Sequence, residues 1–142
     1  MNYLEFLSEH GVTLLFGTVT TVKVFVCSFF LFLIISMIFG LMRLSKNAAI
    51  QGIATVYIEF FRGSSLLGQL FWAYYVLPFF GVSLEAFSAG VLALGLNFGA
   101  YGAEVVRAGI LAVPQGQWEA AHALNFTPSK RMSRIIIPQI FP

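Results

Sequence analysis

Few side chains in this sequence could perform acid–base, nucleophilic or metal chemistry. All six acidic residues are glutamates, and the chain has only two histidines, His10 and His122, and one cysteine, Cys27. The topology predicted below places the two histidines on opposite sides of a membrane, so neither a metal site nor a nucleophile–base pair is expected. The sequence also lacks a glycine-rich phosphate loop followed by Lys and Ser or Thr. We therefore expect no catalytic residue, no cofactor and no bound metal.

The polar segment of about residues 112–138 has instead the residue types of a docking element. Glu119 offers a carboxylate that can pair with a basic group of a partner, and the start of a helix favours such a charge. Ala120 and Ala121 are small enough for close approach, and Trp118 could supply an apolar anchor. The alternative for Glu119 is a solvated carboxylate without a partner.

Local signals in this segment predict two short helices that meet at a tight corner. Residues 117–124 are a good helical stretch after a break at Gly116. Asn125 can adopt the left-handed conformation that ends a helix. Thr127 then offers an N-cap, with Pro128 at the first helical position.

The same residues resemble the EAA loop of ABC importer permeases. That pattern is Glu-Ala-Ala, three residues, Gly, nine residues, then Ile-x-Leu-Pro, and the spacing here fits without a gap from Glu119 to Pro138. Asn125 stands in place of the Gly and Ile137 in place of the Leu. The resemblance implies that this loop docks into a cleft on a separate ATPase subunit. It assigns the coupling to Trp118, Glu119, Ala120, Ala121, Asn125 and Pro138.

Two further stretches, residues 57–70 and 100–110, look like segments of the polar amino acid permease subfamily, of the histidine, glutamine and arginine permease type. Residues 96–102 are similar to the ectoine and hydroxyectoine permeases. These resemblances imply an importer subunit for amino acids or related small polar solutes in the bacterial inner membrane. They imply three kinds of partner: an ABC ATPase, a second permease subunit in a homo- or heterodimer, and a solute-binding protein.

The composition favours a lipid environment. Hydrophobic residues make up 58% of the chain and charged residues only 10%, against about 25% in a soluble domain. Crossing a bilayer takes roughly 20 apolar residues, and three runs qualify, at about residues 14–42, 64–82 and 86–104. We therefore predict one all-α, polytopic permease domain over residues 1–142. Buried core helices and a β-barrel are the weaker alternatives, since the runs are consecutive and do not alternate.

The basic residues set the predicted orientation. One group flanks the connection between the first two spans and another follows the third span, so both groups belong on the cytoplasmic side with the EAA loop. The N-terminus and the loop at residues 81–85 then face outward. Because the net charge is only +2 and no basic stripe is present, we expect membrane lipids and no nucleic acid as contacts.

The third span contains a stripe of small residues at four-residue spacing. Gly95, Gly99 and Ala103 form this stripe and favour close helix packing. Asn97 and Tyr101 lie on another face, where a solute path and interhelical hydrogen bonding are equally good interpretations.

Glu104 and Arg107 are three residues apart near the inner end of this span and can form an ion pair. A role of Glu104 in the solute path or in coupling is the second interpretation.

Two expectations concern the whole chain. Members of the resembled family continue with further spans after the EAA loop, so we expect this chain to be truncated at its C-terminal end. The main functional alternative is a small, non-transporting membrane protein with an interaction or regulatory role and an EAA-like loop.

Overall fold

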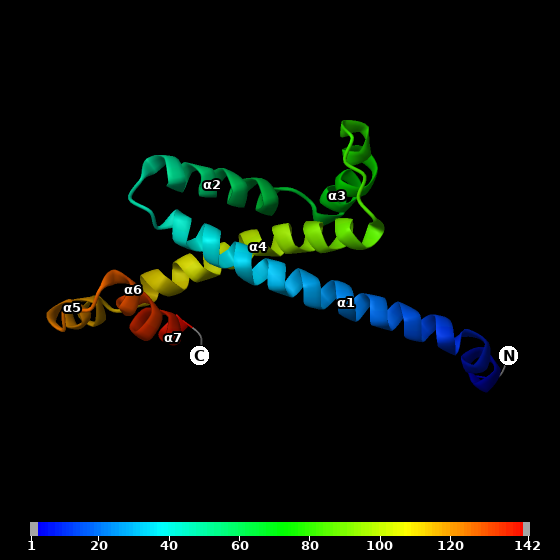
Figure 1. Ribbon diagram of the computed structural model, residues 1–142, viewed down its shortest axis with the longest axis horizontal. Helices are drawn as coiled ribbons and strands as arrows, with labels where there is room; N and C mark the ends of the chain where they lie inside the picture. Colours follow the sequence, from blue (N-terminus) through cyan, green and yellow to red (C-terminus); the bar gives the residue numbers. More distant parts are fainter. Residues whose placement is uncertain (1–2, 141–142) are drawn as a thin grey trace.

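The structure, a computed structural model, describes residues 3–140, and these residues form helices without any strand (Figure 1). The elements in chain order are α1 (Tyr3–Arg43), α2 (Ala48–Gly63), α3 (Leu66–Phe71), the π-helical turn η1 (Trp72–Val76), the 3-10 turn η2 (Leu77–Phe80), α4 (Ala86–Ala112), α5 (Gln115–Ala123), α6 (Pro128–Arg131), the π-helical turn η3 (Met132–Ile136) and α7 (Ile137–Ile140).

Helices α1 and α4 form the central pair, and glycines let them approach closely. A Cβ added to Gly95 would lie 2.5 Å from Leu31 Cδ2, and one added to Gly99 would lie 2.5 Å from Ile35 Cγ2. Further along, Gly40 of α1 meets Val106 of α4 in the same way. Because residue numbers rise together along both helices, α1 and α4 run parallel.

The stripe predicted from Gly95, Gly99 and Ala103 therefore lies in a helix–helix interface. Ala103 is fully buried, and Gly40 approaches its carbonyl oxygen. Gly102 also faces α1, where a Cβ would lie 2.5 Å from Phe32 Cε2. The four-residue spacing did not include Gly102 or Gly40.

Helix α2 lies where the sequence analysis had a loop between the first two spans. Asn47 caps its start, accepting a hydrogen bond from the Ala49 N–H at 2.9 Å. Its buried face consists of Ala54 and Ile58, which are four residues apart. Hydropathy did not predict this helix, because Glu59 and Arg62 interrupt its apolar residues.

The predicted second span at residues 64–82 is not a regular helix. It contains α3, η1 and η2, which together form one short apolar helical segment, Leu66–Phe80. Pro78 lies in the 3-10 turn, and Gly81 ends the segment with φ 85°. In Figure 1 this segment projects away from the α1–α4 pair at the start of α4.

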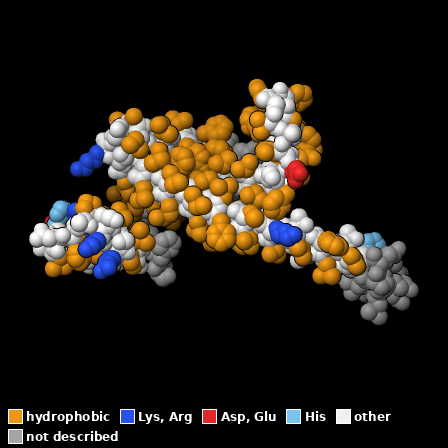
Figure 2. Space-filling view, in the orientation of Figure 1, with side chains coloured by type: hydrophobic (Ala, Val, Ile, Leu, Met, Phe, Trp, Pro, Cys, Tyr) orange, Lys and Arg blue, Asp and Glu red, His pale blue; other side chains and the backbone are white. Residues whose placement is uncertain are grey.

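The described residues contain two helices that are long and apolar enough to cross a membrane, where three spans were predicted. They are residues 10–43 of α1 and residues 86–112 of α4. The second of these extends past the predicted end at residue 104. Many large apolar side chains on these helices are exposed, for example Phe16 at 71% and Phe25 at 67%. Figure 2 shows the resulting hydrophobic face over α1, α2 and α4, with basic side chains over the α5–α6 end.

Candidate functional site

The corner between α5 and α6 has the geometry of a Schellman motif. The Phe126 N–H donates to the Ala121 carbonyl at 3.1 Å, and the Asn125 N–H donates to the His122 carbonyl at 2.9 Å. Asn125 has φ 51°, the only positive φ at a non-glycine residue among those described. The left-handed conformation predicted for Asn125 is therefore confirmed. Asparagine tolerates it at modest cost, which explains how the corner forms without glycine.

The next helix begins as its sequence predicts. Thr127 is the N-cap of α6, and its hydroxyl oxygen accepts a hydrogen bond from the Lys130 N–H at 3.4 Å. Pro128 occupies the first helical turn, where its missing N–H costs nothing. Short-range chemistry thus fixes the angle between α5 and α6.

The start of α5 differs from the prediction. The helix begins at Gln115 rather than at residue 117, after Pro114 in an extended conformation, and Gly116 lies inside its first turn. Glu119 is therefore one turn inside the helix, and no acidic residue lies in the first turn. Because the helix dipole acts mainly within that first turn, its expected stabilisation of the Glu119 carboxylate does not apply.

The inner face of α5 attaches it to the end of α4. Trp118 is partly buried and packs against a cluster of Val106, Ile110 and Ile136. Ala121, with 1% exposure, lies on the same inner side. Trp118 was predicted to supply an apolar anchor, and in the structure its ring packs α5 onto this chain.

The outer face of α5 and its corner is free of such packing. Glu119, Ala120 and Asn125 are exposed, and Leu124 is 66% exposed. Pro138, further along the chain, is exposed as well. An exposed carboxylate beside small and apolar side chains is a surface that another protein could contact.

His122 is exposed and contacts a basic side chain across the corner. Its Nε2 lies within hydrogen-bonding range of Arg131 Nη1, so the neutral ring can accept from the guanidinium. This contact links α5 to α6. It gives His122 a structural position rather than a chemical role.

Glu104 joins three helices in the C-terminal half of α4. Its Oε2 lies 3.0 Å from Arg107 Nε, the pair expected from their spacing, and its Oε1 lies 3.5 Å from Arg43 Nε at the end of α1. Arg43 Nη1 in turn donates to Thr55 Oγ1 of α2 at 2.8 Å. Two arginines thus neutralise one partly buried carboxylate, as expected of a charge in an apolar setting. The sequence offered no signal for Arg43, which is distant along the chain.

Asn97 makes an interhelical hydrogen bond, the second of the two roles considered for it from the sequence. It is 5% exposed, and its Nδ2 donates to the Phe61 carbonyl at 3.0 Å, where α2 is about to end. Gln69 Nε2 donates to the same carbonyl at 3.1 Å and to Ser64 Oγ at 2.6 Å. These side chains satisfy backbone groups that the break between α2 and α3 leaves without helical partners.

Tyr101 differs from Asn97 in being accessible. Its side chain is 46% exposed, and the Arg62 guanidinium carbon lies 5.4 Å from the centre of its ring. This is the geometry of a cation–π contact. Of the three residues predicted for a solute path, only Tyr101 has a polar group, its hydroxyl, without a hydrogen bond or ion pair among the residues that the structure describes.

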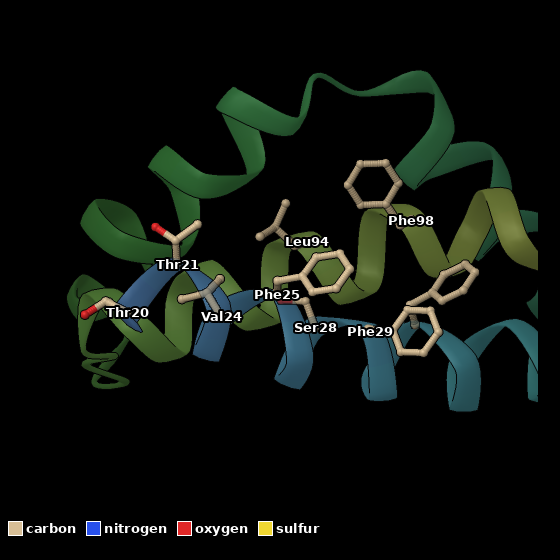
Figure 3. A pocket seen from close by; sticks show the side chains of 9 residues that line it. Thr20, Thr21, Val24, Phe25, Ser28, Phe29, Leu94 and Phe98 are labelled. Carbon is tan, nitrogen blue, oxygen red and sulfur yellow. The ribbon is translucent and has the colours of Figure 1, made fainter. Parts of the chain in front are cut away.

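The cavities do not coincide with the predicted solute path. One, of about 590 Å³, lies between residues 20–32 of α1 and α4 (Figure 3). Its walls are mostly apolar, with Phe25, Leu94 and Phe98 around it in Figure 3. A second cavity of about 430 Å³ lies at the break between α2 and α3 and is also mainly apolar. Neither is lined by Tyr101 or Glu104.

Comparison with protein families gives a match over most of the chain. The family described as "Binding-protein-dependent transport system inner membrane component" matches residues 32–142. The matched range includes α2, α4 and the α5–α6 corner.

Similar proteins are amino-acid permeases. A probable amino-acid ABC transporter permease of Sinorhizobium fredii is 46% identical over 89% of this chain and 56% of its own length. An L-cystine transport system permease of Bacillus subtilis is 41% identical over 88% of this chain and 53% of its own. A putative glutamine transport permease of Rickettsia felis is 42% identical over 89% of this chain and 60% of its own length. The chain spans about half the length of these curated relatives.

A solved structure shares the fold. The crystal structure of an amino acid ABC transporter with histidines superposes with a TM-score of 0.79 at 41% identity. The match covers 95% of this chain and 64% of the other.

Proposed function

Because this chain belongs to the family of binding-protein-dependent transport system inner membrane components, we propose that it serves in the permease of an ABC importer for amino acids or related small polar solutes. The permease would use the energy of ATP hydrolysed on a separate subunit. Relatives named for amino acids, L-cystine and glutamine support this solute class. Ectoine and hydroxyectoine remain candidates within it.

The observation that carries the coupling role is the two-sided construction of α5. Trp118 and Ala121 hold its inner face on the end of α4. Glu119 and Ala120 leave its outer face open to a partner. A helix with this arrangement can dock on an ATPase subunit and pass a displacement to α4. We therefore assign the docking contact to Glu119, Ala120 and the exposed corner at Asn125, with Pro138 beside it.

The arrangement of helices supports a membrane topology with the corner in the cytoplasm. Since α1 and α4 run parallel, the connection between them must return across the bundle, and α2 with Leu66–Phe80 forms that return. We propose three crossings of the bacterial inner membrane, with the N-terminus outside. Arg43, Lys46 and Arg107 then lie toward the inner face, as the positive-inside rule requires.

The proposal includes two further partners. A second permease subunit would cover part of the exposed apolar surface of α1 and α4, and a solute-binding protein would deliver the solute from outside. The family description, which names binding-protein-dependent transport, supports the second of these.

Capture of the ATPase subunit tests the coupling role. The full-length permease, tagged and co-expressed with its ATPase, should retain that ATPase during purification. Glu119→Arg should weaken capture, because it reverses the charge on the docking face. Glu85→Arg is the matched control. Glu85 is also an exposed glutamate, but it lies at the N-terminal end of α4, whereas α5 follows the C-terminal end. Equal capture by both variants, with normal uptake, would refute the docking role of α5.

A further inference from the structure

Arg62 is a charged residue of α2 without a carboxylate partner among the described side chains. It is exposed, and its recorded contact is with the ring of Tyr101. No hydrogen bond from its guanidinium is recorded in the described part of the chain, although this group carries five N–H donors. A cation so placed has its binding capacity available.

Arg62 lies in the last turn of α2, at the opposite end of this helix from the basic residues Arg43 and Lys46 that precede it. It lies fourteen residues after Ala48, the first residue of α2, which at 1.5 Å per residue is about 21 Å. The hydrocarbon core of a bilayer is about 30 Å thick. Ionisable groups at such depth usually face a protein interior or a solute path, because exposure to lipid is costly.

The surroundings of Arg62 are held in place by buried contacts. The carbonyl of the preceding residue, Phe61, accepts hydrogen bonds from Asn97 and Gln69. Tyr57 of α2 also donates to the Leu96 carbonyl at 2.6 Å. These bonds fix the end of α2 against α4, where the exposed guanidinium of Arg62 lies over the ring of Tyr101.

A carboxylate of the opposite charge lies one helical turn away on the same helix. Glu59 precedes Arg62 by three residues, a spacing that places two side chains on one flank at about 5–6 Å between their Cβ atoms. It is exposed, and no ion pair is recorded between the two. An α-amino acid carries an ammonium and a carboxylate group at a similar small separation.

We propose that Arg62, positioned on the ring of Tyr101, binds the carboxylate group of a zwitterionic solute and that Glu59 binds its ammonium group. This inference rests on the proposed function and deepens it, since it locates a site on the membrane domain for the common part of amino acids. Asn97 then acts as a positioning residue, because it holds the end of α2 against α4.

Direct binding to the purified permease–ATPase complex, without the solute-binding protein, tests the site. The probe is a uniformly ¹⁴C-labelled mixture of the protein L-amino acids, from which the bound species are identified. The α-amide of each bound amino acid, which lacks the carboxylate, serves as the competitor. Arg62→Gln should weaken binding of the amino acid by roughly 10- to 100-fold, the effect of losing a charge-assisted hydrogen bond. It should weaken binding of the α-amide much less, because the amide carbonyl accepts a hydrogen bond but carries no charge.

Three further variants separate binding from folding. Arg62→Lys keeps the charge but not the forked donors, so it should recover part of the affinity. Tyr101→Leu removes the ring on which Arg62 lies and should weaken binding of the amino acid more than binding of its α-amide. Lys46→Gln removes a positive charge that lies away from Glu59 and Arg62, and this variant should bind the amino acid normally.

The outcomes distinguish this inference from the proposed function. If the wild-type complex binds no labelled amino acid and, once its solute-binding protein is added back, transports none either, the proposed amino-acid specificity fails, and the site inference with it. If the wild type binds and Arg62→Gln binds equally well, the site alone is wrong and Arg62 reaches toward lipid headgroups instead. Equal losses for the amino acid and its α-amide would also overturn the inference, because they indicate a structural role.

Discussion

Gly99 offers the sharpest test of the packing between α1 and α4. A Cβ at this position would lie 2.5 Å from Ile35 Cγ2 and 2.9 Å from Ile35 Cβ, where ordinary contacts begin at 3.4 Å. Gly99→Ala therefore forces a separation of about 1 Å between the helices or a rotation of the Ile35 side chain. Ser36 Oγ, which donates to the Gly99 carbonyl at 3.4 Å, would lose this contact if the helices separate.

The expected cost is that of overpacking, about 1–3 kcal/mol. For a chain of the size of the full-length relatives, each kcal/mol shifts Tm by about 2–4 °C. We therefore expect Gly99→Ala to lower the Tm of the purified permease by a few degrees to about 10 °C. Adding Ile35→Ala should restore part of this loss, because it removes the atoms that the new methyl group meets.

The assay is thermal unfolding of the detergent-purified permease, followed by the loss of the monodisperse peak in size-exclusion chromatography. Gly90→Ala is the control, because Gly90 is on the same helix and no atom lies within 4 Å of its added Cβ. It should be neutral or slightly stabilising, since alanine is the better helix former. If Gly99→Ala is as stable as Gly90→Ala, the close contact between α1 and α4 is refuted.

Two further predictions concern the corner and the end of α2. Asn125→Gly should leave thermal stability unchanged or slightly raised, whereas Asn125→Val should lower it by about 1–2 kcal/mol, because φ 51° is unfavourable for a β-branched residue; equal unfolding midpoints would contradict the left-handed corner. Asn97→Leu removes one of the two side-chain donors to the Phe61 carbonyl and leaves the other, Gln69, so it should cost about 0.5–1.5 kcal/mol in denaturant unfolding. An unaffected midpoint would refute a stabilising role of the Asn97 hydrogen bond.

The corner was predictable because its determinants are local. Asn125, Thr127 and Pro128 each act through backbone groups within a few residues, so the sequence alone indicates a left-handed end followed by a capped helix. The start of α5 was less certain, since Pro114 can precede a first turn as readily as it can break one. For that reason Glu119 lies one turn inside α5 rather than in the first turn, where it was predicted.

The contacts of α2 could not be predicted in the same way. A hydropathy window rejects a segment that contains Glu59 and Arg62, although Ala54 and Ile58 bury one face of it. The partners of Glu104 and Asn97 lie on other helices and are fixed only by the packing of α1, α2 and α4. Spacing along one helix predicted the Glu104–Arg107 ion pair. It could not predict the contact of Glu104 with Arg43, which belongs to another helix.

Helix α4 connects the two functional surfaces that we propose. At its inner end, Val106 and Ile110 receive Trp118 of the docking helix. Tyr101 lies five residues before Val106, or about 7.5 Å along the axis. Between them, Glu104 binds Arg43 and so ties α4 to α1. A displacement of α5 would therefore reach Tyr101 through one continuous helix. Because hydrogen bonds from Asn97 and Tyr57 hold the end of α2 against α4, Arg62 would move together with Tyr101 and the proposed site would shift as one unit.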